Sequence, residues 1–332
     1  MSEKKKQNTN LTLFERVDVI KNKKTFPFVF SVSMLIIMTL LFGVLTGGRF
    51  FGKTVLVGIF QQSIIVGVMS IGISFIYSTG DVDFSVGNVM GLAAALGAIS
   101  YQHSESVVVM ITVTILTALA LMLFNCTLSV VFKVKSSMVA IVAMTLYSAI
   151  TIELVGANPI AVDYKICRSL ENGWFRYTTF IIYLFACLII YHTTPLGRKL
   201  RFIGGNETCS KQTGISFMKS KYLAFVVTGI GVGLAGIYTI IRSGSVANTV
   251  GSGMGMNVML AIVLGGMSLF GGARSNSYSG FIGAMTVNTL NKGLLMVGVE
   301  SSIIQGVRGF LFLLLVFMNS ERPATLPTKQ QF

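Results

Sequence analysis

Long apolar runs separated by short polar stretches are the dominant pattern along the chain. A helix needs about 20 apolar residues to cross the hydrocarbon core of a bilayer, and runs of about that length recur throughout. We predict spans over 27–46, 54–78, 84–101, 106–132, 137–156, 175–193, 221–241, 257–271, 277–297 and 301–319. Several runs are shorter or more interrupted by glycine than a simple helix would be, notably those over 84–101 and 257–271. The pattern predicts an all-α, polytopic integral membrane protein with about ten transmembrane helices.

Composition agrees with this class and leaves little room for a soluble enzyme. Hydrophobic residues make up 53% of the chain, charged residues 11%, and the mean hydropathy is +0.75. The first apolar run, from Phe26 to Val44, has no small-residue cleavage site behind it, which favours a membrane helix over a removed signal peptide. The four cysteines show no paired spacing, so we expect neither a disulfide framework nor a metal site; they are Cys126, Cys167, Cys187 and Cys209.

The distribution of positive charge predicts the orientation of the chain. Its net charge is +14, and with both ends inside, 18 of the 26 Lys and Arg residues fall in cytoplasmic segments. Cytoplasmic loops of membrane proteins carry an excess of Lys and Arg, so we expect both termini in the cytoplasm. The positive charge follows from topology and does not indicate binding to nucleic acid.

One polar stretch, 194–222, interrupts the apolar pattern. It contains six cations, namely Arg198, Lys199, Arg201, Lys211, Lys219 and Lys221. Within it, Asn206 is a good helix N-cap, Glu207 suits the positive helix start, and Gly214 can close a helix in the left-handed conformation. We predict a capped helix of about two turns outside the bilayer. From these residues alone, the stretch is either a docking surface or a solvated loop that obeys the positive-inside rule.

Four ordered blocks of sequence resemble the ribose-type, or monosaccharide, ABC transporter permease family. The segment STGDVDFSVGNVMGLAAALGAIS (78–100) is similar to the family signature at Val82, Asp83, Phe84, Ser85, Val86 and Gly87. The polar stretch resembles a second family block at Leu196, Gly197, Arg198, Gly204, Gly205, Asn206, Glu207, Gly214 and Ile215. The segments 260–272 and 288–316 resemble the C-terminal blocks. The likeness covers nearly the whole chain in order.

The resemblance implies the permease subunit of a bacterial ABC importer for a monosaccharide or related small polyol, a multi-pass protein of the cell membrane. It implies a cytoplasmic segment over 1–26, a permease domain over 27–319 and a cytoplasmic tail over 320–332. It also implies three protein partners, which are a cytoplasmic ATP-binding subunit, a second permease copy or paralogue, and an extracytoplasmic substrate-binding protein. The segment 197–215 is then the element that couples to the ATPase.

Catalytic chemistry is not expected in this chain. The sequence has no G-x-x-x-x-G-K-[ST] phosphate loop, so ATP hydrolysis is expected in a partner subunit. The histidines, His103 and His192, lie near span ends, which is typical of membrane-interface residues and not of a catalyst. We expect no catalytic residues, no cofactor and no metal.

The signature turn holds two carboxylates between the second and third spans, Asp81 and Asp83. One interpretation is that Asp83 and Ser85 cap the third helix, with Gly87 part of the same turn. The other is that a carboxylate belongs to a translocation gate or an ion path, since intramembrane carboxylates are costly. The family commonly has Gly where this chain has Asp81, so no role for Asp81 follows from the resemblance.

Three more ionisable residues lie within spans: Glu153, Lys292 and Arg308. All three fall in the outer halves of their spans, so intramembrane ion pairs among them are one hypothesis, and substrate contact is the other. The glycines Gly229, Gly233 and Gly236 fit close helix packing better than a pore.

Two outer segments carry the remaining candidates. The segment 242–260 resembles a family block that often reads Gly-Tyr-Glu-Leu-Asp, but Met254, Gly255, Met256 and Asn257 occupy it here and both acids are absent. The outer loop 157–174, with Arg49 and Lys53, is either a landing surface for a binding protein or an ordinary solvated loop.

Other transport functions stay open at this stage. Permeases for nucleosides or branched-chain amino acids are related ABC subunits, although the Asp-Phe-Ser-Val-Gly block favours the sugar branch. An ion-coupled secondary transporter could use Asp81, Asp83 or Glu153. A channel or scaffold without coupled transport would not need the capped helix.

Overall fold

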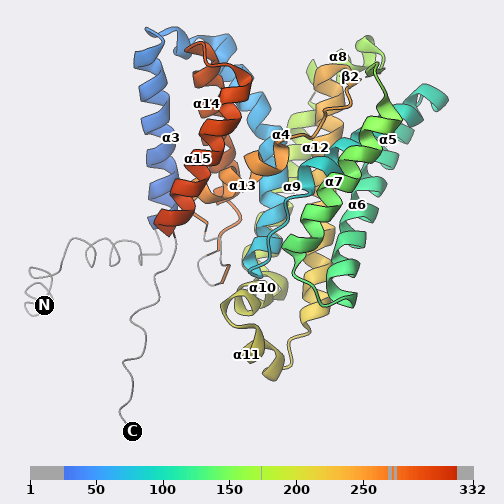
Figure 1. Cartoon of the computed structure of the whole chain (residues 1–332), viewed down its shortest axis with the longest axis vertical. Helices are drawn as coiled ribbons and strands as arrows, with labels where there is room; N and C mark the ends of the chain where they lie inside the picture. The colour runs from blue at the N-terminus through green and yellow to red at the C-terminus, as the bar shows by residue number, and fades with distance from the viewer. Residues whose placement is uncertain (1–25, 173, 268–270, 273–274, 320–332) are drawn as a thin grey trace, which may run out of the picture.

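Helices form nearly all of the described chain, which in this computed structural model comprises residues 26–172, 174–267, 271–272 and 275–319. Each of the ten predicted spans corresponds to a helix (Figure 1). In chain order these are α3 (Phe26–Leu45), α4 (Lys53–Ser78), α5 (Val86–Ser104), α6 (Val107–Val131), α7 (Ser136–Val155), α9 (Phe175–Thr193), α12 (Phe217–Ser243), α13 (Met254–Leu264), α14 (Ser279–Met296) and α15 (Ser301–Asn319).

Six of these helices are long and apolar enough to cross a bilayer: α3, α4, α6, α7, α9 and α12. The protein is therefore an all-α, polytopic membrane protein. Two of the six differ from the others in burial. Within their apolar windows, 67% of α4 and 72% of α12 is buried inside the protein, against 17–28% for α3, α6, α7 and α9. The pair α4 and α12 forms the centre of the bundle, and the other four leave much of their surface for lipid.

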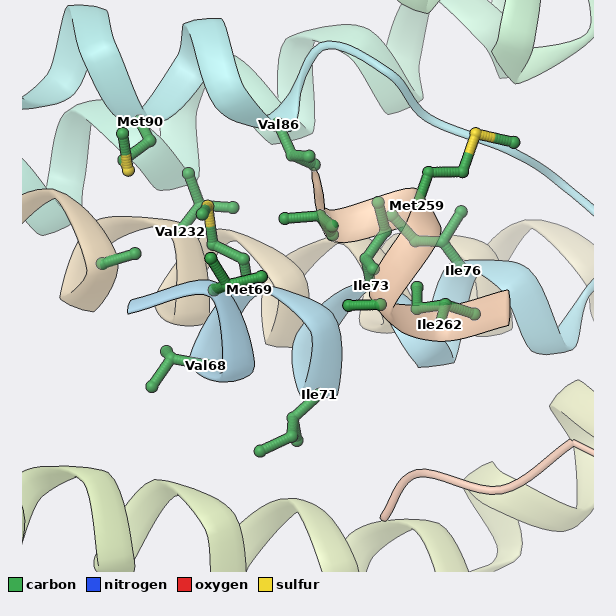
Figure 2. Close-up of a cluster of buried hydrophobic side chains, with 14 of the residues drawn as sticks. Val68, Met69, Ile71, Ile73, Ile76, Val86, Met90, Val232, Met259 and Ile262 are labelled. Carbon is green, nitrogen blue, oxygen red and sulfur yellow. The ribbon is translucent and has the colours of Figure 1, made fainter. Parts of the chain in front are cut away.

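The centre of the bundle is a continuous apolar core. Figure 2 shows its side chains coming from α4, α5, α12 and α13. The labelled residues include Met69 and Ile73 of α4, Met90 of α5 and Met259 of α13, all of which are buried. Glycines on α12 bring α6 close, because a Cβ at Gly233 would lie 2.9 Å from the Cα of Ile115. The predicted packing role of these glycines is confirmed.

The prediction of a full span over 257–271 is wrong in both position and length. Helix α13 begins three residues earlier and has 11 residues, about 17 Å at 1.5 Å per residue, against a hydrocarbon core of about 30 Å. It ends at a glycine pair, where Gly266 has φ +79° and the N–H of Met267 donates to the Ile262 carbonyl at 3.1 Å. Glycine in the left-handed conformation stops this helix before it can cross.

Three shorter helices and a strand pair complete the described fold. They are α8 (Tyr164–Asn172), α10 (Pro195–Gly205), α11 (Glu207–Gln212), and the antiparallel strands β1 (Ile160–Ala161) and β2 (Ser245–Val246). A 3₁₀ turn, η2 (Arg49–Phe51), joins α3 to α4. In Figure 1, α8 and β2 lie at one end of the bundle, and α10 and α11 lie beyond the opposite end.

Candidate functional site

The polar stretch after α9 folds into two consecutive helices, and the second is the predicted capped helix. The Oδ1 of Asn206 accepts the N–H of Cys209 at 3.0 Å, and Gly214 has φ +77°. The capped helix is thus confirmed as α11, which begins at Glu207. Helix α10 was missed, although Pro195 at its first turn and the i, i+4, i+7 spacing of Leu196, Leu200 and Ile203 are typical helix signals.

Helix α10 is seated on the ends of α9 and α4 through two glycines. A methyl group at Gly197 would overlap the carbonyl of Tyr191, and one at Gly204 would overlap the carbonyl of Ser78. Tyr191 and Ser78 are themselves joined by a 2.7 Å hydrogen bond between their hydroxyls. Only glycine lets the backbone of α10 approach this closely. The last residue of α4 is therefore in direct contact with the polar segment.

Another part of this segment's surface lacks such contacts within the described chain. Apart from its chain neighbours and its own helix backbone, no described atom lies within 4 Å of the position that a Cβ would take at Gly205. Arg198 is exposed and donates from Nη1 to the carbonyl of Thr193 at 3.3 Å, and Cys209 on α11 is exposed as well. The two helices thus have one face packed on the bundle and another that is open.

The signature turn begins directly after Ser78, and its second carboxylate is buried. Asp83 is 2% exposed, and its Oδ1 accepts the backbone N–H of Ser85 at 2.8 Å and the Ser85 hydroxyl at 2.6 Å. Ser85 accepts from the Nδ2 of Asn125 on α6 at 2.9 Å, and the hydroxyl of Tyr147 on α7 donates to the Oδ1 of Asn125 at 2.7 Å. This chain of hydrogen bonds fixes the start of α5 against α6 and α7.

The first carboxylate of the turn, Asp81, forms an ion pair that sequence reasoning missed. Its Oδ2 lies 2.7 Å from the Nζ of Lys221 on α12, and the exposed fractions of the two side chains are 18% and 5%. Lys221 also donates to the hydroxyl of Ser129 on α6 at 2.9 Å. In the sequence Lys221 reads as one of six cations of a polar stretch, and no local pattern indicates a partner 140 positions earlier.

The signature glycine, Gly87, marks a close approach of α5 to the segment that precedes α13. A Cβ at Gly87 would lie 2.6 Å from the backbone N of Gly255 and 2.7 Å from the carbonyl oxygen of Gly251. Gly251 also has φ +85°. The signature turn is therefore held from three directions: by α10 at Ser78, by α6 and α12 at its carboxylates, and by 251–255 at Gly87.

The three other ionisable residues within spans do not meet one another. Glu153 and Lys292 are exposed on α7 and α14. Arg308 on α15 donates from Nη1 to the Oδ1 of Asn257 and from Nε to the carbonyl of Ile304 at 3.3 Å. Among the described residues, no ion pair joins these three. The side-chain partner of Arg308 is thus Asn257, near the start of α13.

The end of the bundle opposite α10 and α11 contains a polar cavity of about 220 Å³ between α8 and the end of α12. Arg168, Glu171 and Arg242 contribute charged groups to its wall. Glu171 also lies 3.4 Å from the Nη1 of Arg176, which is 1% exposed. Helix α8 was not predicted, and the structure shows that the outer loop 157–174 is an organised surface and not a bare loop.

Comparison with known proteins agrees with this architecture. A family model described as "Branched-chain amino acid transport system / permease component" matches residues 55–316. The ribose import permease protein RbsC of Escherichia coli K12 is 27% identical over 82% of this chain and 88% of its own length. The galactofuranose transporter permease protein YtfT of the same organism is 27% identical over 84% of this chain and 83% of its own.

A third relative, the fructose import permease protein FrcC of Rhizobium meliloti, is 26% identical over 88% of this chain and 85% of its own length. No solved structure shows a significant match. The family match runs from the first turn of α4 into the last turns of α15 and so includes the signature turn, α10 and α11. The chain is therefore a multi-pass membrane protein and a transport subunit that belongs to the family of branched-chain amino acid transport system permease components.

Proposed function

We propose that this chain is the permease subunit of a bacterial ABC importer that moves a monosaccharide or related small polyol across the cell membrane. Relatives named for ribose, galactofuranose and fructose transport align over more than four fifths of the chain. The observation that carries the proposal is the module of α10 and α11, which is packed on α4 beside the signature turn and open on its other side. A transport subunit without a phosphate loop does not hydrolyse ATP itself. It therefore needs such a contact, through which conformational changes of a partner ATPase can move its helices.

In this proposal the segment 197–215 docks in a groove of the cytoplasmic ATP-binding subunit. Its contact residues are Gly197, Arg198, Gly204, Gly205, Asn206, Glu207 and Gly214. About ten helices lie in the membrane over 27–319, and the segments 1–26 and 320–332 are cytoplasmic. Two permease chains, identical or paralogous, enclose the path. ATP-driven closure of the ATPase moves α10 and α11 and switches the path between outward and inward access.

The outer end of the bundle receives the substrate-binding protein. The charged wall of the cavity beside α8 supports this assignment, because oppositely charged groups on a partner would orient it there. Arg49 and Lys53 are exposed near the turn between α3 and α4, at the same end of the bundle (Figure 1). The binding protein delivers the sugar at this end, and the ATPase acts at the other.

The test is association with the ATPase, measured by a mild-detergent pull-down of the tagged chain from native membranes with mass spectrometry. We expect wild type to recover an ATPase with phosphate-loop motifs and an extracytoplasmic binding protein. Gly205→Trp should abolish recovery of the ATPase, because it adds bulk to the open face without disturbing the packed one. The matched control is Gly58→Trp, at another glycine with open space, near the outer end of α4.

Two results would overturn the proposal. One is recovery of the chain only with itself in several detergents. The other is uptake that survives ATP depletion and collapses with the ion gradient, as an ion-coupled secondary transporter would show. Sugar identity then follows from thermal-shift screening of the recovered binding protein.

A further inference from the structure

The two carboxylates of the signature turn are anchored to different parts of the bundle. Asp83 is held through Ser85 to α6 and α7, by hydrogen bonds of 2.6–2.9 Å. Asp81 is held by Lys221, in the second turn of α12, at 2.7 Å. Lys221 in turn bonds Ser129, one helical turn beyond Asn125 on α6. The turn is thus anchored to α6 and α7 by hydrogen bonds and to α12 by an ion pair.

A buried ion pair is weak evidence of a contribution to stability. Removing two charges from water is costly, and replacing a buried pair by neutral groups of similar size is often neutral or stabilising. Here Lys221 and Asp81 are 5% and 18% exposed. Removal of Asp81 alone would leave the charge of Lys221 buried without its counter-ion. Stability alone therefore does not explain the pair, and we consider a role in fixing one element relative to another.

The position of the pair indicates which elements it fixes. Helix α11 ends at Gln212, and α12 begins soon afterwards at Phe217. Ser216 caps α12, because its side chain accepts the N–H of Lys219. Lys221 thus comes shortly after α10 and α11 along the chain, and these two helices form what we call the ATPase-contact module. Asp81 stands three residues after Ser78, on which α10 rests through Gly204. The chain from α10 into α12 accordingly contacts this region at two points: α10 packs at Ser78, and Lys221 of α12 pairs with Asp81.

We propose that Asp81 and Lys221 are positioning residues that carry movement of the ATPase-contact module into the signature turn and the start of α5. This inference rests on the proposed function. The packed contact at Gly204 can push on the turn but cannot pull it, whereas an ion pair resists separation. With both contacts, α12 and the turn move together when α10 and α11 are displaced. A chain with glycine in place of Asp81 has only the packed contact.

The experiment measures how the ATP state of the complex changes access to the turn. A Thr79→Cys variant in a Cys209→Ser background, where the remaining Cys126, Cys167 and Cys187 are buried, is labelled with maleimide in nanodiscs that contain the permease and its ATPase. Labelling rates are compared without nucleotide and after trapping with Mg-ATP and vanadate. When Asp81 and Lys221 are both intact, we expect the two labelling rates to differ about fivefold or more. A factor of about five is the lower end of the range by which one site usually affects another.

The variants separate a coupling role from a purely structural one. Asp81→Asn and Lys221→Met alone should lower the unfolding temperature, and the double variant should recover at least part of the loss because neither member of the pair is left without the other. The double variant should nevertheless lose the ATP-dependent difference in labelling. If the pair only stabilised the fold, the double variant would regain both the unfolding temperature and the ATP-dependent difference in labelling. The control Lys135→Met removes an exposed lysine at the same end of the bundle and should change neither quantity.

The outcomes distinguish the two proposals. If no ATPase is recovered with the wild-type chain, the proposed function fails, and the coupling role fails with it. If the complex forms and hydrolyses ATP but the double variant keeps the wild-type labelling difference, only the coupling role is overturned. A wild-type complex that hydrolyses ATP without any change in labelling at Thr79 overturns it as well.

Discussion

At the scale of single residues, two adjacent glycines serve different purposes at the end of α10. Gly204 is required inside the protein, because its Cα faces the carbonyl of Ser78 and the N–H of Gly272. Gly205 has open space around it. The same family block therefore contains one glycine for internal packing and one that leaves a flat surface for a partner. The sequence presents them as an undifferentiated pair.

This difference predicts opposite effects of two alanine substitutions. Gly204→Ala should destabilise the protein by about 1–3 kcal/mol, the usual cost of overpacking, because the methyl group meets backbone atoms that cannot rotate away. Gly205→Ala should leave the unfolding temperature within the scatter of wild type. Thermal unfolding of the two purified variants in the same detergent measures the contrast. Equal unfolding temperatures would show that α10 is not seated on α4 as described.

At the scale of elements, the short helices carry most of what is specific to this site. Helix α11 has six residues and depends on its ends, the Asn206 cap and Gly214, since an isolated helix of this length is unstable in water. Helix α10 depends on its apolar side, where Leu200 and Ile203 are buried. Together they hold an open polar face beyond the end of the bundle, where a second protein can reach it (Figure 1).

A native cysteine reports the side of the membrane on which α11 lies. Cys209 is exposed, while Cys126, Cys167 and Cys187 are buried. A membrane-impermeant maleimide should therefore label the chain in inside-out vesicles and leave it unlabelled in intact cells. Cys209→Ser should abolish the signal. Labelling in intact cells would place α11 outside and contradict the cytoplasmic docking of the ATPase.

At the scale of the whole molecule, α4 and α12 form the shared centre on which the rest of the bundle is arranged. Both lead directly to the site: α4 ends at Ser78, under α10, and α12 starts just before Lys221. The opposite end of the bundle has its own surface, formed by α8, the strand pair and the cavity lined by Arg168 and Arg242. Two surfaces at opposite ends, joined through buried central helices, suit a protein that relays events across a membrane.

The predicted orientation of the whole chain gives a third test. Green fluorescent protein fused after Phe332 should fluoresce, and alkaline phosphatase at the same place should be inactive, because the positive-inside rule puts this end in the cytoplasm. A fusion at Gly48, in the turn after α3, should give the reverse pattern. An active phosphatase after Phe332 would require an odd number of crossings from a cytoplasmic N-terminus and would reject the ten-helix topology.

Local sequence was sufficient for the helices and for the cap of α11. Apolar runs and capping residues act on neighbours in the chain, so all ten predicted spans correspond to helices, and Asn206 and Gly214 close α11 as expected. Family resemblance, carried by short ordered blocks, located the signature turn and the polar segment. The length of α13 was misjudged because the apolar run continues past Gly265 and Gly266, and hydropathy alone gives no weight to a glycine that turns the backbone.

Tertiary structure alone decided which of these residues meet. Asp81 and Lys221 are 140 positions apart, and Gly204 and Ser78 belong to helices separated by five others, so no local pattern could pair them. Burial then determined their chemistry: the same lysine that would be a solvated cation on a loop is 5% exposed and bound to a carboxylate. The sequence by itself determined the class of the protein and its segments, because these depend on whether each segment is apolar enough for lipid or polar enough for water. The site depends on contacts between distant segments, and these exist only in the folded bundle.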